Sequence, residues 1–374
     1  MIKKILIIVM IIIMLTITIS INAFDIDAVS AILIEASTGK IMYEKNADAP
    51  LPPASVTKVM TMLLVMEAID GGVIQLSDVV QTSENAASMG GSQIYLKVGE
   101  EMTVEDMLKS VVIASANDAA VALAEFICGS EESFVSRMNE RAAELGTANT
   151  NFENTNGLDD DTQNHVMSAR DIAIITQELL KHPKILEYSG IWMDTVRGGD
   201  FGLTNTNRLV RFYNGANGLK TGSTSRAKFC ISATAKRDGM QLIAVIMASP
   251  TRDTRNEAAK KLFDYGFANY SYVKIESGTL DSLRVLGGVS DECGIIYNSF
   301  SAVTDKGTEK NIEQNIIIPE TLSAPVKSGQ KIGVIEYKLN GEKIGEADII
   351  TCDEINKIGY FELFMKLYKK FLLI

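Results

Sequence analysis

The chain has 374 residues, of which 46% are hydrophobic, and its formal net charge is −11. This length predicts two domains, and the hydrophobic content is sufficient for a sizeable core. The acidic balance argues against nucleic acid as a partner, because nucleic-acid binding needs a concentrated basic face. Four scattered cysteines without a C-x-x-C pair and only two histidines argue against a zinc site, and no cofactor or metal is expected.

The amino terminus has the pattern of an export signal. Lys3 and Lys4 precede the apolar run 5–21, and Ala23 supplies a small residue for cleavage. This pattern predicts a cleaved signal peptide over residues 1–23 and therefore an exported protein. The apolar run is also long enough to serve as an uncleaved membrane anchor, which is the alternative interpretation.

The first folded element after this leader is predicted to be a β-hairpin. Residues 31–34 and 40–43 are rich in apolar side chains, and Ser37-Thr38-Gly39 between them is a turn sequence. We expect this hairpin to join later strands in one antiparallel sheet. The largely helical region 55–190 would then be inserted between the first strands and the later ones.

Ser55 and Lys58 form an S-x-x-K pair at the start of a predicted helix, because the apolar-rich segment 56–69 ends at a Gly-Gly pair. Free backbone N–H groups at a helix start can stabilise an oxyanion, and Lys58, one turn later, can reach the Ser55 hydroxyl. Burial and nearby cations could lower the pKa of Lys58 enough for it to act as a base. The same spacing recurs without being singled out by its context at Ser225/Lys228, Ser271/Lys274 and Ser328/Lys331.

Ser115 and Asn117 lie in a predicted break between two helices. A capping-box pattern starts the first helix at Thr103, and Asp118 is a candidate N-cap for the second helix, 119–128. A hydroxyl and an amide that project from such a break can both face a cleft. Ser115 could relay a proton to a leaving amine, and Asn117 could bind a substrate amide. The alternative is that both residues only cap or turn the chain.

Lys220, Thr221 and Gly222 lie on a predicted strand, 218–222, that precedes a predicted hairpin, 229–247, with an Asp-Gly turn. The lysine would bring positive charge to a cleft, and the threonine would bring a hydroxyl, both suited to a substrate carboxylate. The glycine has no side chain, so a ligand backbone could lie against this strand.

The carboxy-terminal part of the chain changes character. Residues 276–352 contain short strands and turns, which predict a second, all-β domain without chemical motifs. The segment 355–374 is predicted to be an amphipathic helix that lies in a membrane surface, because it is too short and too charged to span a bilayer. The alternative is a helix packed on its own protein. At helical spacing its apolar face contains Leu363, Phe364, Leu367, Tyr368, Phe371 and Leu372, and the opposite face contains Glu362, Lys366, Lys369 and Lys370.

Taken together, these motifs are similar to those of a low-molecular-weight penicillin-binding protein, specifically a serine-type D-Ala-D-Ala carboxypeptidase of the peptidase S11 type. The resemblance implies an α+β fold, in which a penicillin-binding/serine β-lactamase-like transpeptidase domain (24–272) has helices on both sides of an antiparallel sheet. The small all-β domain (276–352) and the terminal helix (355–374) would follow. The resemblance rests on the segments 53–61, 90–93, 156–158, 169–171, 218–222 and 264–267.

The resemblance also implies four catalytic residues. Ser55 would be the acylated nucleophile and Lys58 its base, while Ser115 and Asn117 would position the substrate and transfer protons. The S-D-N signature of such enzymes has an acidic middle residue, whereas this chain has Ala116 there. The two outer residues, which carry the chemistry, are present.

The remaining implied roles concern substrate binding. Lys220 and Thr221, helped by Arg255, would hold the terminal carboxylate of the substrate beside Gly222. The backbone N–H groups of Ser55 and Ser223 would form the oxyanion hole. We interpret the two histidines as non-catalytic: His165 as structural and His182 as a solvated helix end.

The implied reaction removes the terminal D-alanine from peptidoglycan stem peptides at the outer face of the cytoplasmic membrane or in the cell wall. β-Lactam antibiotics would be covalent inhibitors. A serine β-lactamase is an alternative, but no Glu-x-x-x-Asn of class A enzymes occurs between Asn117 and Lys220. DD-endopeptidase activity on cross-linked stems uses the same chemistry and stays open. A non-catalytic wall-binding protein would require the loss of a motif residue, and all of them are present.

Overall fold

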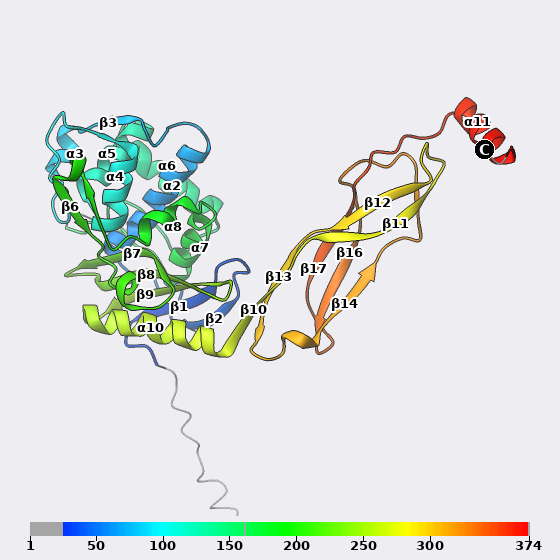
Figure 1. The fold of residues 1–374 in the computed structure, drawn as a ribbon. Helices are drawn as coiled ribbons and strands as arrows, with labels where there is room; N and C mark the ends of the chain where they lie inside the picture. Colours follow the sequence, from blue (N-terminus) through cyan, green and yellow to red (C-terminus); the bar gives the residue numbers. More distant parts are fainter. Residues whose placement is uncertain (1–24, 161, 373–374) are drawn as a thin grey trace, which may run out of the picture.

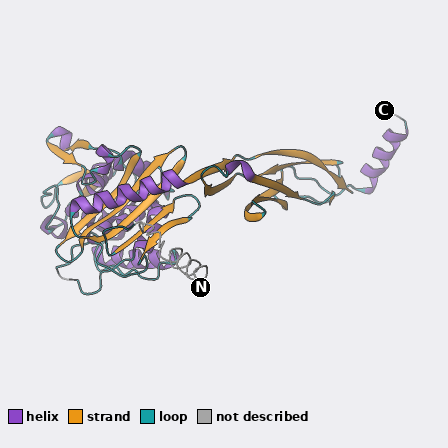
Figure 2. Ribbon diagram, turned by 90° about the horizontal axis from the view of Figure 1, so that it is seen from below, coloured by secondary structure: helices purple, strands orange, loops and turns teal. Residues whose placement is uncertain are grey.

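The computed structural model describes residues 25–160 and 162–372, so the predicted signal peptide lies outside the described residues. Figure 1 shows an elongated molecule with a mixed helix-and-sheet unit at one end, a β region in the middle and helix α11 (Tyr360–Phe371) at the other end. Seen from below in Figure 2, α10 (Arg252–Asn269) lies across the sheet of the first unit and leads into the β region.

The first unit is built on a five-stranded antiparallel sheet with the order β2-β1-β9-β8-β7. Both predicted hairpins and the predicted neighbouring strand are confirmed. The inserted helical region separates β1 and β2 from β7, β8 and β9 in the sequence, and the sheet reunites them. The strands are β1 (Ser30–Glu35), β2 (Ile41–Lys45), β7 (Ala216–Thr224), β8 (Lys228–Arg237) and β9 (Met240–Ser249).

Helices cover both faces of this sheet, as predicted. Strand β9 shows why: Ile243 and Val245 enter the core beneath the helical region, whereas Leu242 and Ala244 enter the core beneath α10. A strand that is buried on both faces needs a continuous apolar run. The helices on the larger side are α2 (Lys58–Asp70), α3 (Glu84–Ser88), α4 (Val104–Lys109), α5 (Asn117–Cys128), α6 (Glu131–Glu144), α7 (Ala169–Leu179) and α8 (Lys184–Ser189). The short helix α9 (Leu209–Phe212) instead contributes Leu209 to the core beneath α10. Two short antiparallel strand pairs, β3 (Val79–Gln81) with β4 (Glu101–Thr103) and β5 (Met193–Val196) with β6 (Phe201–Thr204), complete this unit.

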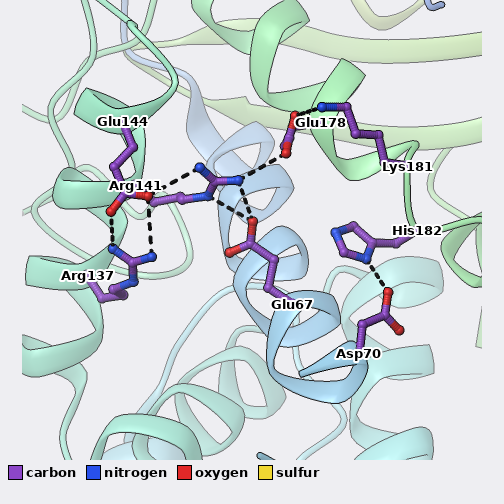
Figure 3. Close-up of polar contacts among 8 residues, drawn as sticks. All are labelled: Glu67, Asp70, Arg137, Arg141, Glu144, Glu178, Lys181 and His182. Atoms are coloured by element: carbon purple, nitrogen blue, oxygen red, sulfur yellow. Dashed lines mark hydrogen bonds and ion pairs between the residues drawn. The ribbon is translucent and has the colours of Figure 1, made fainter. Parts of the chain in front are cut away.

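Polar contacts hold the carboxyl end of α2, the helix that starts beside Ser55 (Figure 3). Arg141 of α6 contacts Glu67 of α2 at 2.7 Å and Glu178 of α7 at 3.0 Å. His182 Nδ1 lies 2.5 Å from Asp70 Oδ2, and its side chain is only 14% exposed. His182 does follow the end of α7, as interpreted, but this helix end is not freely solvated, because the side chain is largely buried and paired with Asp70 at the end of α2.

The β region has its own cores. β10 (Tyr270–Ile275) continues from α10 and pairs with β13 (Phe300–Asp305). A six-stranded sheet with the order β14-β16-β17-β12-β11-β15 makes up the rest. Phe300 and Tyr337 stack in its core with ring centroids 4.0 Å apart. The strands are β11 (Gly278–Leu286), β12 (Glu292–Tyr297), β14 (Ile312–Ile317), β15 (Thr321–Ser323), β16 (Lys331–Leu339) and β17 (Glu342–Thr351).

Helix α11 forms within the predicted terminal segment 355–374 and contacts the β region through an ion pair from the middle of the helix. Lys366 Nζ lies 2.6 Å from Asp291 Oδ1, and Glu362 accepts a hydrogen bond from the backbone N–H of Gly359. Large apolar side chains of α11, such as Phe361 and Phe364, are exposed. In the part of the chain that the structure describes, no helix combines the length and apolarity required to cross a bilayer.

Candidate active site

The turn that carries Ser55 is a 3-10 helix, Ala54–Thr57, which we call the nucleophile turn. It leads directly into α2, so Ser55 lies just ahead of the first α-helical residue, Lys58. The Lys58 side chain is fully buried, and its Nζ lies 3.0 Å from Ser55 Oγ. It also lies 2.6 Å from Asn117 Oδ1 and 2.8 Å from the carbonyl oxygen of Asn156. The S-x-x-K spacing therefore brings the two groups within hydrogen-bond distance.

The burial of Lys58 favours its neutral form. Burial lowers the pKa of Lys58 well below its usual value, the Lys220 ammonium lowers it further, and the Asp118 carboxylate opposes both. A neutral amine has two N–H bonds and one lone pair. The oxygens of Asn117 and Asn156 can only accept hydrogen bonds, so they take the two N–H groups. The lone pair is then left for the Ser55 hydroxyl, which is the geometry that a general base requires.

The predicted break between helices holds Ser115 and Asn117. Helix α4 continues as a π-helical turn, Ser110–Ala114, and Ser115 ends it in the left-handed region with φ 65°. This conformation turns the chain so that α5 starts at once at Asn117. The Asn117 side chain donates to the carbonyl oxygen of Gly90 at 2.7 Å, and its backbone N–H donates to the carbonyl oxygen of Ser92. The loop 90–93 is thereby held beside the site.

The prediction that Asp118 caps the second helix is wrong, because Ala116 occupies the cap position. The Asp118 carboxylate is 1% exposed and accepts backbone hydrogen bonds from Ile94, Leu96 and Ala119 at 2.9–3.2 Å. Since Ile94 and Leu96 follow the loop 90–93, Asp118 fixes this loop against the start of α5. The sequence shows the acidic residue but not the loop that folds over it.

Strand β7 brings the third motif to the same place. Lys220 is fully buried, and its Nζ lies 2.8 Å from Ser115 Oγ and 2.9 Å from the carbonyl oxygen of Thr221. Burial, with the nearby Arg255 guanidinium, lowers the pKa of Lys220 to about 7. A Cβ atom at Gly222 would lie 2.8 Å from the backbone N of Ser55. Glycine is therefore required for β7 to approach the nucleophile turn this closely.

A cleft of about 430 Å³ opens over these groups. It is lined by residues that the sequence predicts and by others that it does not. Among the predicted ones, Arg255 reaches the cleft while its guanidinium also donates to Asn256 Oδ1 and to the Cys230 carbonyl oxygen. No sequence motif marks the lining residues that were not predicted, although one of them, Arg252, lies one helical turn before Arg255. The lining residues are Ser55, Ser92, Ser115, Trp192, Thr204, Asn205, Thr206, Arg208, Thr221, Gly222, Ser223, Arg252 and Arg255.

The charge of the cleft is opposite to that of the whole chain. Arg208, Arg252 and Arg255 line it, and Lys220 lies beneath it. Thr221 Oγ1 contacts Thr206 Oγ1 at 2.8 Å, which orients this hydroxyl at the cleft wall. Such a site suits an anionic group such as a carboxylate. Across the described ranges 25–160 and 162–372, no cluster of three or more His, Cys, Asp or Glu residues could hold a metal ion.

Comparison with known proteins agrees with this geometry. The family model described as D-alanyl-D-alanine carboxypeptidase matches residues 17–251, and that of the penicillin-binding protein 5 C-terminal domain matches residues 282–357. The chain is 44% identical over 341 residues to the D-alanyl-D-alanine carboxypeptidase DacF of Bacillus subtilis, covering 89% of this chain and 87% of the relative.

Solved structures show the same relationship. Penicillin-binding protein 5 of Haemophilus influenzae superposes with a TM-score of 0.77 at 31% identity, over 89% of this chain and 98% of the other. Penicillin-binding protein D2 of Listeria monocytogenes, in its ampicillin-bound form, has a TM-score of 0.60 at 31% identity, over 65% of this chain and 98% of the other. The chain therefore belongs to the S11 family of D-alanyl-D-alanine carboxypeptidases.

Proposed function

We propose that this protein is a serine D-Ala-D-Ala carboxypeptidase that cleaves the terminal D-alanine from peptidoglycan stem peptides through an acyl-enzyme on Ser55. The observation that carries this proposal is the position of Lys58 Nζ, 3.0 Å from Ser55 Oγ, with its N–H groups used by two pure acceptors. A neutral amine with a free lone pair fits this arrangement, and such an amine can take the serine proton.

In the acylation step, Ser55 Oγ attacks the carbonyl carbon between the two D-alanines, and its proton passes to Lys58. The negative charge that develops on the carbonyl oxygen would be held by the backbone N–H groups of Ser55 and Ser223. The C–N bond then breaks, and the proton that Lys58 took from Ser55 passes through Ser115 to the leaving amine, which returns Lys58 to its neutral form. Ser115 is hydrogen-bonded to Lys220 at 2.8 Å, which orients its hydroxyl for this transfer. Water subsequently attacks the ester, with Lys58 as base, and releases the shortened peptide.

The cleft chemistry accounts for a substrate with a free carboxyl terminus. Thr221 lines the edge of β7 beside the nucleophile, Lys220 lies beneath it, and Arg255 adds positive charge. We assign Arg208 and Arg252 to the same electrostatic field, because their side chains also line the cleft. β-Lactams carry a carboxylate next to a reactive amide, so the same groups would guide them to Ser55. The ampicillin-bound form of the similar Listeria protein agrees with this expectation.

We also propose that α11 holds the enzyme at the membrane surface after export. Its apolar residues are exposed, including Phe361 at 76% and Phe371 at 86%. Burying such a face among lipid headgroups is favourable, and Lys369 would meet anionic lipid, whereas Lys366 is already paired with Asp291. The β region separates α11 from the catalytic unit (Figure 1), so this arrangement would place the cleft at a distance from the bilayer. Lys370 belongs to the same predicted basic face, but its side chain lies outside the described residues.

Mass spectrometry can test the catalytic proposal. The protein is incubated with a D-Ala-D-Ala pentapeptide and, separately, with benzylpenicillin. We expect loss of one alanine from the peptide and one penicilloyl adduct on the tryptic peptide that contains Ser55. Ser55→Ala should abolish both without unfolding the protein. An adduct that survives this substitution would refute the assignment of the nucleophile.

Substitutions of the two lysines should have different effects on acylation and turnover. Lys58→Ala removes the base, so acylation should collapse for every substrate. Lys220→Ala should reduce turnover of a peptide with a free terminal carboxylate more than turnover of its amide, because it removes positive charge from the carboxylate site. Equal losses on the two peptides would show that Lys220 does not bind this group.

A further inference from the structure

His165 is buried beside the nucleophile turn, yet the mechanism above gives it no role. Its Nδ1 accepts a hydrogen bond from the backbone N–H of Glu153 at 3.0 Å, and its Nε2 lies 2.7 Å from Thr57 Oγ1. A backbone N–H can only donate, so Nδ1 carries no proton and the neutral ring carries its proton on Nε2. Burial lowers the pKa of His165 to about 4, against the opposing carboxylates of Glu153 and Asp159, and the Arg226 guanidinium lowers it slightly further.

The hydrogen bonds continue in one direction from this ring. Thr57 Oγ1 accepts the Nε2–H of His165, so its own proton is free to go to the carbonyl oxygen of Ala54, 2.8 Å away. Ala54 immediately precedes Ser55 and has φ 48°, in the left-handed region that a residue with a Cβ atom rarely adopts. The chain of hydrogen bonds thus ends on the strained peptide that carries the Ser55 N–H.

The other hydrogen bond of the His165 ring connects it, through the segment that starts at Glu153, with Lys58. The Glu153 amide that donates to His165 begins the segment 153–157, and within it the carbonyl oxygen of Asn156 accepts a hydrogen bond from Lys58 at 2.8 Å. Gly157, the last residue of this segment, packs directly on the nucleophile turn. The approach is so close that a Cβ atom at this position would lie 1.9 Å from the Ala54 carbonyl oxygen. One imidazole therefore connects the peptide before the nucleophile with a hydrogen-bond partner of the base.

We infer that His165 is a positioning residue for acylation, which acts through Thr57 on the Ala54–Ser55 peptide and through Glu153 on the carbonyl partner of Lys58. This inference rests on the proposed role of Ser55 as nucleophile. The expected consequence is kinetic, because a small rotation of the Ala54–Ser55 peptide would misdirect the oxyanion N–H and the serine hydroxyl while leaving the cleft that binds the ligand unchanged.

The first test measures acylation of the full chain by benzylpenicillin in stopped flow, which separates the rate constant at saturation from the dissociation constant of the initial complex. Thr57→Val keeps the side-chain shape and removes the hydroxyl. It should lower the saturating rate constant by about 10-fold to 100-fold and change the dissociation constant by less than about 3-fold. Thr57→Ser should restore the rate. Equal rates for the Val and Ser variants would overturn the inference.

A double-mutant cycle shows whether the two residues act as one chain. His165→Phe should lower the rate as Thr57→Val does, and the double variant should lose little more than either single variant. Phe152→Leu is the packing control, because Phe152 contacts the His165 ring edge to face without entering the hydrogen-bond chain. Independent, multiplicative losses in the cycle would overturn the inference, and so would an equal loss in the packing control at equal stability.

A measurement on the unmodified protein does not depend on the folding of any variant. Nitrogen-15 NMR of histidine-labelled protein, assigned with a His182→Asn variant, should show His165 protonated on Nε2 alone and unchanged between pH 8 and about pH 5. A proton on Nδ1, or titration near the ordinary histidine pKa, would overturn the inference. If wild-type Ser55 is not acylated at all, the proposed function fails instead, which the mass measurement detects separately.

Discussion

Replacing Asp118 by Asn is expected to destabilise the fold and to make Lys58, the proposed base, less basic. The carboxylate accepts hydrogen bonds from the backbone N–H groups of Ile94, Leu96 and Ala119, using both of its oxygens. An amide has one oxygen, so at least one buried N–H would face an NH2 group instead. Loss of a hydrogen bond to a charged, buried acceptor costs about 1.5–3 kcal/mol, and the free energy of unfolding should fall by that amount.

The effect on acylation has a definite sign. The Asp118 carboxylate raises the pKa of Lys58, so its loss lowers the pKa of Lys58 further. The amine then stays neutral to lower pH, and the acidic limb of the acylation rate profile should shift to lower pH. The plateau rate should fall at the same time, because an amine with a lower pKa is a weaker base.

Two measurements check this prediction. Urea unfolding followed by circular dichroism gives the change in stability, and stopped-flow acylation by benzylpenicillin from pH 5 to pH 9 gives the rate profile. Asp78→Asn is the matched control, because Asp78 accepts the backbone N–H of Gln75 at 2.7 Å in a solvent-exposed hydrogen bond. The reasoning is refuted if Asp118→Asn costs no more stability than this control, or if the acidic limb moves to higher pH.

Four further outcomes are expected. The pKa of Lys220 is about 7 in the folded protein, against 10.5 for an ordinary lysine. Between these pH values the unfolded chain binds more protons than the folded protein, so the free energy of unfolding rises with pH. Lys220→Met should reduce this rise between pH 7 and pH 9 by about 2 kcal/mol in urea unfolding. Gly222→Ala should cost about 1–3 kcal/mol and slow acylation by crowding the nucleophile turn, whereas Gly202→Ala, in open space, should do neither. Arg141→Met should lower the free energy of unfolding by about 1–2 kcal/mol, because the partly buried Glu67 loses its ion pair, while Glu144 and Glu178 keep only their pairs with Arg137 and Lys181. Deletion of residues 355–374 should release the processed protein from anionic vesicles in a sedimentation assay while leaving peptide turnover intact, and a truncated protein that still sediments would contradict the role of α11.

Features that depend on a few neighbouring residues are predictable from the sequence. Ser55 and Lys58 are three residues apart, so any helix that starts at this point places them on adjacent positions of one turn. The hairpin β8–β9 follows from apolar strands around an Asp-Gly turn, and its burial on both faces agrees with the continuous apolar run of β9. In each case the controlling interactions are local, and a pattern of residue types is enough to specify them.

The interactions between distant motifs depend on how the whole chain packs. Burial lowers the pKa of Lys58, and that burial is created by α5, by the segment that carries Asn156 and by β7 with Lys220. Asp118 looks like a helix cap in the sequence, but the folded loop above it offers backbone N–H groups that make it a buried acceptor. Arg208 has no recognisable motif, and it lines the cleft only because of the path of the chain before β7. Desolvation and contacts between remote segments depend on the complete packing, which no short run of residues encodes.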